Sequence, residues 1–329
     1  MKRRGAATDW FGEAAGRRLK AFLPETAMRL LLAFAALTLG LAPAAAAQPR
    51  HAAPAIVNAR IGTNITWSQQ RRPRPVTYRF GDVTLEVRPV MDEGMYAPRV
   101  TVRQGRNRAV MTGSAAPPAY EHKLGVGAFD RRGTRFVFFQ SFTGGAHCCN
   151  EMQAAIIEPR GIRVVQIGTF DGGPEDAFPR DVDGDGIVDF VDRDNSFLYT
   201  FASYAGSFAP PQILNIVGSR TVDVSTRPGF RRLFRDAMND ARPACVEQGP
   251  DRNGACAGYV AAAARAGQFD AAWAVMLRSY ERDSGWDLPT GCRVPPGQDG
   301  SCPAAATITY ANFPDALHAF LVRQGYLAR

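Results

Sequence analysis

Between residues 76 and 224, apolar and polar positions mostly alternate along the chain. Residues 76–90 read VTYRFGDVTLEVRPV and residues 97–113 read APRVTVRQGRNRAVMTG, with Gly-Asp and Gly-Arg-Asn interrupting the alternation. A period of two residues is typical of strands with one buried face, and such interruptions are typical of hairpin turns. Further runs of strand type occur at residues 135–140, 153–158, 163–170, 187–191, 197–204 and 212–217. The pattern predicts a mainly antiparallel β domain over residues 76–224, either a sandwich or partial propeller-like.

After about residue 225 the spacing of apolar positions becomes helical. In residues 228–241 they stand three or four apart, at Phe230, Leu233, Phe234, Ala237 and Met238. Two further helices are predicted within residues 255–282, joined at Gly267, and a last helix within residues 313–327. The sequence therefore predicts an α+β fold, in which the β domain is followed by a small α-helical domain over residues 225–329.

The first residues have the three parts of a secretory signal peptide. Arg29 precedes an apolar core at residues 30–41, and Ala45 and Ala47 form a small-residue cleavage site. The core is about 12 residues long, shorter than the roughly 20 that span a bilayer. We therefore expect residues 1–47 to be a signal region with cleavage after Ala47, and Met28 is an alternative start.

The expected location of the mature protein is periplasmic or secreted, with no stable membrane span after cleavage. Residues 48–75 are rich in Ala, Pro, Gln and Arg and are predicted to form a flexible arm. The formal net charge of the whole chain is +8, but residues 1–47 contribute seven basic and three acidic residues. The excess that remains is small, and no cluster of arginines alternates with aromatic residues. A nucleic-acid partner is therefore not expected.

Six cysteines are present in the chain. An even number in an exported protein favours disulfide bonds over free thiols. Bonds between Cys245 and Cys256, and between Cys292 and Cys302, would each close a short loop and staple the helical domain. Neither pair has the Cys-x-x-Cys spacing of a zinc site. Connectivity stays open, because six cysteines allow about fifteen pairings.

The strongest chemical motif is the acidic stretch at residues 181–192, which reads DVDGDGIVDFVD. Ca²⁺ takes about six to eight oxygen ligands, and alternating carboxylates in a short loop can supply them from its inner side. Gly186 stands where such a loop must turn. The predicted Ca²⁺ ligands are the carboxylates of Asp181, Asp183, Asp185, Asp189 and Asp192 and the backbone carbonyl of Ile187. The alternative is an acidic, solvated turn that binds no metal.

The surroundings of this loop differ from those of an EF-hand, which has a helix on each side and Glu at its twelfth position. Here Asp192 stands at that position, and residues 187–191 have a strand pattern. Over about 40 residues the stretch resembles the FG-GAP/VCBS-type repeats of integrin-α-like β-propellers. A weaker copy begins at Phe129 and has lost its acidic residues. The resemblance implies a structural ion and a surface that binds partners. Separately, residues 255–282 resemble a single tetratricopeptide-like helical hairpin.

Residues 142–151 read FTGGAHCCNE and allow three interpretations. Cys148 and Cys149 are bonded to each other or to distant cysteines, and the pair is structural. Alternatively, His147 lowers the pKa of a neighbouring thiol, or joins both cysteines in holding a soft metal ion. In the third interpretation one cysteine is a nucleophile activated by His122 or His147. No sequence signature of a known cysteine hydrolase accompanies them.

Two functional hypotheses follow from these patterns. The first is an exported periplasmic Ca²⁺-binding protein without catalysis, which binds a protein or another component of the cell envelope. The second is an envelope redox, metal-binding or hydrolytic enzyme that uses His147, Cys148 and Cys149. The first is favoured, because no established catalytic motif occurs in a fitting context.

Overall fold

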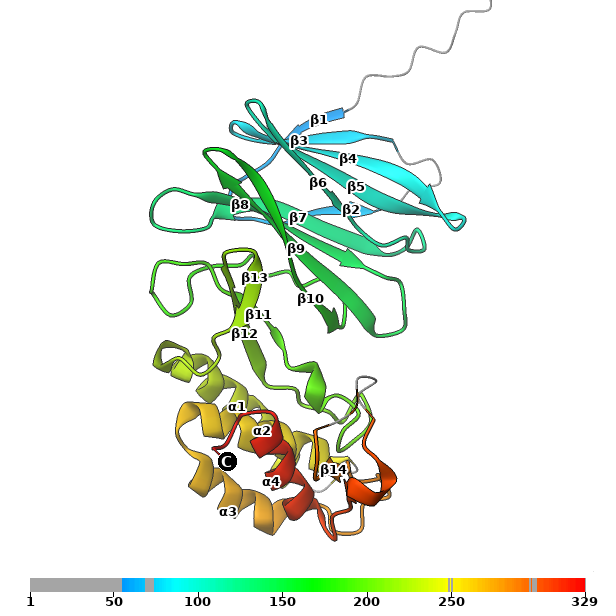
Figure 1. The fold of residues 1–329 in the computed structure, drawn as a ribbon, viewed down its shortest axis with the longest axis vertical. Helices are drawn as coiled ribbons and strands as arrows, with labels where there is room; N and C mark the ends of the chain where they lie inside the picture. The colour runs from blue at the N-terminus through cyan, green and yellow to red at the C-terminus, as the bar shows by residue number, and fades with distance from the viewer. Residues whose placement is uncertain are drawn as a thin grey trace, which may run out of the picture. The chain divides into compact units, whose positions relative to one another are not determined.

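The computed structural model describes residues 55–68, 74–247, 249, 251–295, 297 and 301–328, all within one compact unit spanning residues 52–329. The predicted signal region at residues 1–47 lies outside the described residues. Within them, mostly antiparallel strands come first and helices follow (Figure 1). The α+β class and the helical C-terminal region predicted from the sequence are therefore confirmed.

The first sheet has five strands in the order β1-β3-β4-β5-β6. Their bounds are β1 Ala55–Asn58, β3 Val76–Phe80, β4 Val83–Asp92, β5 Met95–Gln104 and β6 Asn107–Thr112. Strands β3 to β6 are joined by successive hairpins, whereas β1 pairs with β3 in parallel. The two interruptions noted in the period-two pattern, Gly-Asp and Gly-Arg-Asn, correspond to the β3–β4 and β5–β6 hairpins, whereas the β4–β5 turn was not predicted.

The second sheet also has five strands, in the order β10-β9-β8-β7-β2. Their bounds are β2 Ile65–Ser68, β7 Glu121–Ala128, β8 Arg135–Phe142, β9 Cys148–Glu158 and β10 Gly161–Asp171. One core lies between the two sheets, where Val83, Leu85 and Val87 of β4 pack with Leu124 of β7 and Phe139 of β8. Of the two predicted architectures, the structure forms the sandwich.

The second sheet is buried on both faces. Phe136 and Phe138 of β8 point away from the sandwich core and pack against Leu214 and Ile216 of a third sheet. That sheet consists of β11 Phe190–Arg193, β12 Pro211–Val217 and β13 Arg220–Asp223. A strand covered on both sides needs apolar residues at successive positions, which explains the unbroken apolar run in β8.

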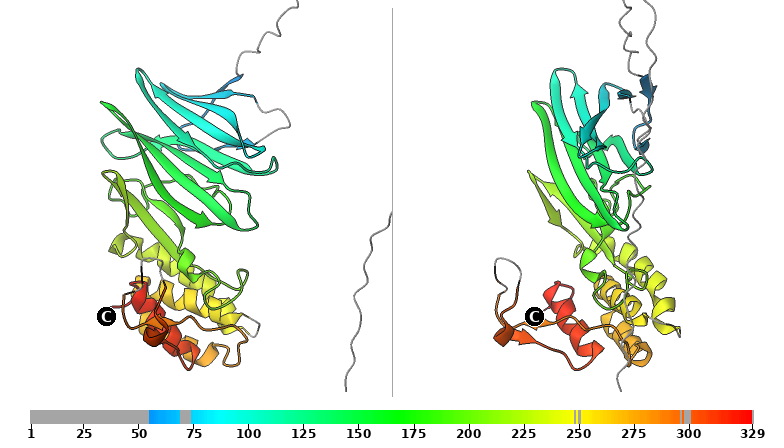
Figure 2. Two further views of the ribbon diagram at one scale, coloured as in Figure 1. Left: turned by 45° about the vertical axis from the view of Figure 1, so that its right-hand side comes forward. Right: turned by 90° about the vertical axis from the view of Figure 1, so that its right-hand side faces the viewer.

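Helices lie at one end of the third sheet and cover part of its remaining face (Figures 1 and 2). Ile213 of β12 packs with Phe230 and Phe234, and Ala266 joins the same core. The helices are α1 Arg231–Val246, α2 Arg252–Ala266, α3 Phe269–Ser279 and α4 Phe313–Arg323, with short turns η1 Asn195–Phe197, η2 Pro228–Phe230 and η3 Ala304–Ala306. The third sheet is therefore a middle layer with a core on each side.

Two disulfides lie in the helical region. Cys245 near the end of α1 is bonded to Cys256 in α2, which fixes the turn between the two helices. Cys292 is bonded to Cys302, beside a small sheet of β14 Gly291–Cys292 and β15 Thr307–Ile308. Helix α2 consists largely of alanine and glycine and is buried along most of its length, so its neighbours approach it closely.

Two predictions differ from the structure. Part of the expected flexible arm at residues 48–75 is ordered, because β1 and β2 complete the edges of the two sheets and Trp67 of β2 is buried in the sandwich core. Residues 197–204, predicted as a strand, instead comprise the last residue of η1 and a series of turns and bends. Phe197 and Phe201 stand four positions apart and both contact Phe320 of α4, so their spacing serves helix packing.

Candidate functional site

The acidic loop lies between β10 and β11 and is fixed by two isolated bridges. Ile187 pairs with Asp130, and Asp189 pairs with Arg180. The backbone N–H of Arg131 donates to the Gly186 carbonyl at 3.1 Å. The turn that begins at Phe129 therefore lies directly beside the acidic loop. This turn was predicted from the sequence to be a weaker copy of that loop.

Three carboxylates of the loop converge. One oxygen each from Asp181, Asp183 and Asp189 lies within 4.8 Å of the others. Oxygens on opposite sides of a bound Ca²⁺ are about 5 Å apart, so this spacing fits a single hard cation with an all-oxygen donor set. Asp189 is only 1% exposed, and its carboxylate accepts hydrogen bonds from Asn215 Nδ2 at 2.7 Å and from the Val182 N–H at 2.8 Å.

Local hydrogen bonds shape the exposed part of the loop. The carboxylate of Asp181 accepts the N–H groups of Gly184 at 2.7 Å and Gly186 at 2.9 Å, and Asp183 accepts that of Asp185 at 3.0 Å. Gly186 has a φ of +92°, and a Cβ there would overlap the side chain of Arg131. Glycine is therefore required at the position where the loop turns.

Two arginines from other parts of the chain lie against the loop. Arg227 forms an ion pair with Asp185 at 2.9 Å, and Arg131 lies 3.9 Å from Asp181. Asp185 consequently faces Arg227 and lies outside the cluster of Asp181, Asp183 and Asp189. The sequence motif alone could not reveal the ion pair between Arg227 and Asp185. Arg227 lies in the segment after β13, and the fold of the third sheet brings that segment next to the loop.

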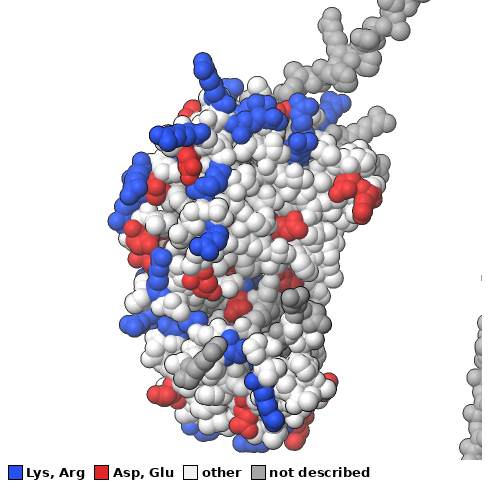
Figure 3. Space-filling view, in the orientation of Figure 1, with Lys and Arg blue, Asp and Glu red and all other residues white. Residues whose placement is uncertain are grey.

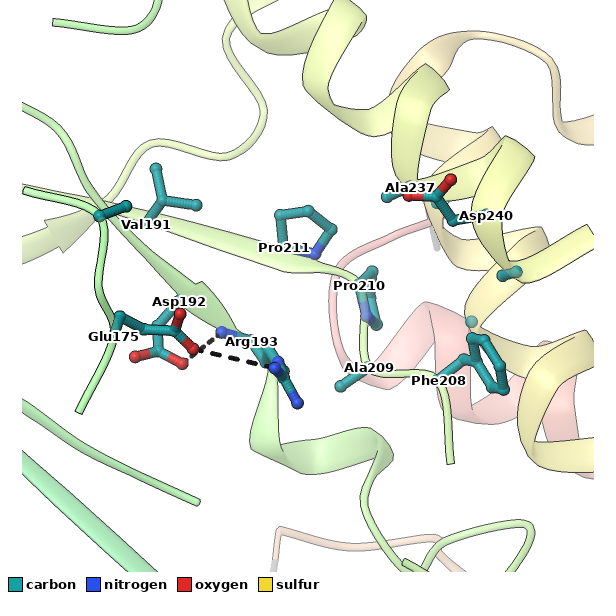
Figure 4. A pocket seen from close by; sticks show the side chains of 14 residues that line it. Glu175, Val191, Asp192, Arg193, Phe208, Ala209, Pro210, Pro211, Ala237 and Asp240 are labelled. Carbon is teal, nitrogen blue, oxygen red and sulfur yellow. Dashed lines mark hydrogen bonds and ion pairs between the residues drawn. The ribbon is translucent and has the colours of Figure 1, made fainter. Parts of the chain in front are cut away.

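Asp192 also lies outside that cluster. It stands on β11 and lines a cavity of about 400 Å³ between the third sheet and helices α1 and α2 (Figure 4). Glu175, Arg193 and Asp240 line the same cavity, and Arg193 lies 3.8 Å from Glu175. Burial, and then the charge of Glu175, raises the pKa of Asp192 to about 7. This cavity was missed by sequence reasoning, because its walls come from five separate segments.

The FTGGAHCCNE segment connects β8 to β9. The sulfur atoms of Cys148 and Cys149 are placed as a disulfide, and no described cysteine is free. The Cys149 N–H donates to Thr143 Oγ1 at 2.7 Å, which holds the turn. His147 packs edge-on against Tyr204, with the ring centroids 4.2 Å apart. A bonded pair offers no thiolate, so in this state it can act neither as a nucleophile nor as a metal ligand.

His122, the other candidate base, lies inside the β sandwich. Its ring is fully buried, with Nδ1 3.1 Å from Ser141 Oγ and its centroid 5.5 Å from that of Trp67. Burial lowers the pKa of His122 to about 4, so the imidazole is neutral at pH 7. His122 therefore has a structural role between the strands, and only His147 stands beside the two cysteines.

Comparison with known proteins adds an extracytoplasmic relative. The chain is 41% identical over 196 residues to the "Probable thylakoid lumen protein sll0997" of Synechocystis sp., covering 58% of this chain and 56% of that protein. It is 32% identical over 269 residues to "Uncharacterized protein y4bJ" of Sinorhizobium fredii, covering 80% and 42% respectively. The chain thus spans about half the length of these relatives. No solved structure matches it.

A family model described as the sll0997 C-terminal domain matches residues 234–325. This stretch runs from within α1 to just beyond α4 and contains both disulfides of the helical region. It includes Asp240 and the helical wall of the cavity, whereas the acidic loop precedes it. The match therefore covers one side of the cavity and leaves the predicted Ca²⁺ ligands outside.

The distribution of surface charge and the character of the helices indicate the environment of the protein. Basic and acidic side chains lie next to one another over much of the face drawn in Figure 3, as on a solvated surface. Of the helices in the described part of the chain, none is both long and apolar enough to cross a membrane.

Proposed function

We propose that this protein is an exported, non-catalytic Ca²⁺-binding protein, periplasmic or secreted, that binds a protein or another component of the cell envelope. The similarity to a probable thylakoid lumen protein supports a location outside the cytoplasm, since that lumen is an extracytoplasmic compartment. The paired cysteines support it as well, because disulfides persist in oxidising compartments.

The observation that carries the Ca²⁺ proposal is the convergence of Asp181, Asp183 and Asp189. These carboxylates would hold the ion, with the Ile187 carbonyl as a further ligand. The ion would supply the positive charge that lets three carboxylates approach closely, and so would tie the exposed loop to the buried Asp189. A structural role of this kind agrees with the resemblance to FG-GAP/VCBS-type repeats.

Calorimetric titration of the chelator-treated protein with Ca²⁺ tests this proposal, together with thermal unfolding in Ca²⁺ and in chelator. At a Ca²⁺ concentration about 100 times the dissociation constant, the free energy of unfolding should rise by about 2.7 kcal/mol. The double variant Asp181→Asn, Asp183→Asn should lose both the binding heat and this stabilisation. The variant Asp236→Asn, which changes an exposed residue of α1, should keep them. A wild-type protein that gives no binding heat and unfolds identically in chelator would refute the proposal.

The alternative function uses His147, Cys148 and Cys149 as a redox, metal-binding or hydrolytic site. Its metal-binding and hydrolytic forms require reduced cysteines, whereas the two cysteines are placed as a disulfide, and its redox form would alternate between the two states. The surroundings of His147 are the rings of Tyr199 and Tyr204, and no carboxylate is among its ring contacts or hydrogen bonds in the described structure. This geometry favours the structural interpretation of the segment.

A further inference from the structure

The cavity beside Asp192 adjoins a second, more enclosed cavity. The outer one measures about 400 Å³ and the inner one about 210 Å³. Glu175, Ala177 and Val191 line both, so the two volumes meet at these residues. Together they extend from the rim between the third sheet and α1 inward to the apolar face of the second sheet.

The outer cavity combines an apolar wall with an excess of negative charge. Its apolar lining is provided by Val191, Phe208, Ala209, Pro210, Pro211, Ala237, Ala241 and Ala262. Its charged lining is three carboxylates, Glu175, Asp192 and Asp240, against the single guanidinium of Arg193. Figure 4 shows Glu175 and Asp192 close together at one side, with Asp240 on the helix opposite. Arg193 is paired with Glu175 at 3.8 Å, so the other two carboxylates have no matching cation in the lining.

The inner cavity is mainly apolar and aromatic. Its walls are Phe138, Met152, Phe178, Pro179, Val182, Phe190, Val191 and Leu233, with Ala177 at the junction. The charged residues among its lining are Glu175, Arg180 and Asp189. Asp189 is directed toward Asn215 and Val182 by its hydrogen bonds, so the surface left for a ligand is chiefly hydrocarbon.

Small residues on two helices leave this space open. Ala237 and Ala241 are one turn apart on α1, and Gly258 and Ala262 are one turn apart on α2, so each pair lies on one helix face. A Cβ at Gly258 would overlap the backbone of Phe208, which shows that close packing requires glycine there. Ala237 lines the cavity and is partly exposed, so a larger side chain there would occupy cavity space.

We propose that the two adjoining cavities bind an amphiphilic organic cation, with its ammonium group among Glu175, Asp192 and Asp240 and its hydrocarbon body against the proline and alanine wall, extending toward the inner cavity. Binding sites for small molecules are typically concave, mostly apolar and furnished with a few directed polar groups, as here. Asp192 and Glu175 are partly buried and Asp240 is exposed at the rim, so a cationic head could enter from solvent and would offset the repulsion between Asp192 and Glu175. This proposal does not depend on Ca²⁺ binding at the loop.

Three probes with the same hydrocarbon chain test it: n-octylammonium chloride, 1-octanol and sodium octanoate. Each is titrated calorimetrically into the purified full chain at about pH 8.5, where Asp192 is ionised and octylammonium keeps its charge, at low ionic strength and in the presence of chelator. Octylammonium should bind at least about tenfold more tightly than octanoate, with octanol between them. Equal affinity for octanoate, or no detectable binding of octylammonium, would overturn the proposal.

Variants locate the site. Glu175→Gln should weaken octylammonium binding about fivefold or more while leaving octanol binding unchanged. The loop stays in place in this variant, because the backbone of Glu175, not its carboxylate, is held by Gln140 at 2.8 and 3.0 Å. Asp240→Asn should also weaken octylammonium binding, whereas Asp236→Asn on the same helix but outside the cavity should not. Equal effects of these two substitutions would mean that only the overall charge matters, and would contradict the proposed site.

Filling the cavity is a second, independent test. Ala237→Phe should abolish the binding of octylammonium and octanol, since a phenyl ring on α1 would occupy the outer volume. Should Ala237→Phe fail to fold, Ala209→Phe places the same ring into the cavity from the segment before β12. Retained octylammonium affinity in a folded filling variant would place the binding elsewhere and refute the inference.

Discussion

Asp189 and Asp192 stand three residues apart, and both have a pKa raised by burial, yet their surroundings differ. At Asp189 the hydrogen bonds from Val182 and Asn215 oppose the effect of burial on the pKa. At Asp192 the main opposing hydrogen bond comes from its neighbour Arg193, and the nearby charge of Glu175 raises the pKa further.

This difference separates two kinds of acidic site within one segment. The carboxylate of Asp189 is directed by donors toward Asp181 and Asp183, an arrangement suited to a compact inorganic ion. The carboxylate of Asp192 lines a cavity with apolar walls, an arrangement suited to a larger organic group. The spacing of the two aspartates along the chain does not predict which kind of site each one forms. The direction of each side chain is set by the pairing of β11 with β12.

Among substitutions that test the difference between Asp189 and Asp192, the largest expected effect is on the free energy of unfolding. Asp189→Ala should lower the free energy of unfolding by about 3 kcal/mol, because it removes the hydrogen bonds that a buried carboxylate accepts from the Val182 N–H and from Asn215 Nδ2. Urea unfolding at neutral pH in chelator measures the change without any contribution from Ca²⁺. Asp192→Ala is the matched substitution and should cost less than about 1 kcal/mol. Equal losses in the two variants would show that the surroundings of these residues do not differ as described.

An intermediate effect is expected in the pH dependence of stability. The pKa of Asp192 is about 7 in the folded protein against an ordinary value of 3.8, so between these values the folded state holds a proton that the unfolded state has lost. The stabilisation from this proton is therefore lost as the pH rises toward 7 and above. Relative to Asp192→Asn, the wild type should become less stable by about 2 kcal/mol between pH of about 4 and about 8, allowing for screening by water.

The measurement is urea unfolding of both proteins at several pH values across that range. Asp192→Asn is the control, because its amide resembles the protonated acid in shape and does not titrate. A difference between the two proteins that does not change with pH would mean that Asp192 titrates normally.

The smallest expected effect concerns Asp185. Its ion pair with Arg227 is partly exposed, so Asp185→Asn should lower the free energy of unfolding by less than about 1 kcal/mol, and less still in high salt. Because Asp185 faces Arg227, this variant should also keep its Ca²⁺ affinity within about threefold of the wild type. A loss of Ca²⁺ binding comparable to that of the Asp181, Asp183 double variant would return Asp185 to the ligand set.

The sequence predicted those elements whose patterns are set locally. The β3–β4 and β5–β6 hairpins of the first sheet and helix α1 follow from apolar periodicity, since each buries one face. Residues 197–204 have a strand-like pattern because aromatic residues suit strands as well as helix contacts, and only the presence of α4 decides between them. Trp67 was assigned to a flexible arm because its partner strand, β7, lies far along the chain.

The acidic site was predictable in composition but only partly in geometry. The motif identified Asp181, Asp183 and Asp189 as neighbours, and a short loop brings such residues together. Position twelve of the motif led to Asp192, but β11 begins at Phe190 and side chains of a strand alternate between faces. Asp192 therefore points away from the side on which Asp189 lies, a result that depends on pairing with β12.

The middle position of the third sheet limits how the helical region can be handled as a separate piece. The family match begins at Phe234, inside α1, yet Phe234 packs with Ile213 and Phe230, which precede the matched stretch. A fragment that begins at residue 234 would contain only the helical half of this shared core. Its apolar residues, Phe234 and Ala266 among them, would be exposed to solvent. The smallest fragment that folds independently should therefore begin before β11, so that it includes the third sheet together with the helices. Chimeras joined at residue 234 should fold only where the host protein supplies an equivalent sheet.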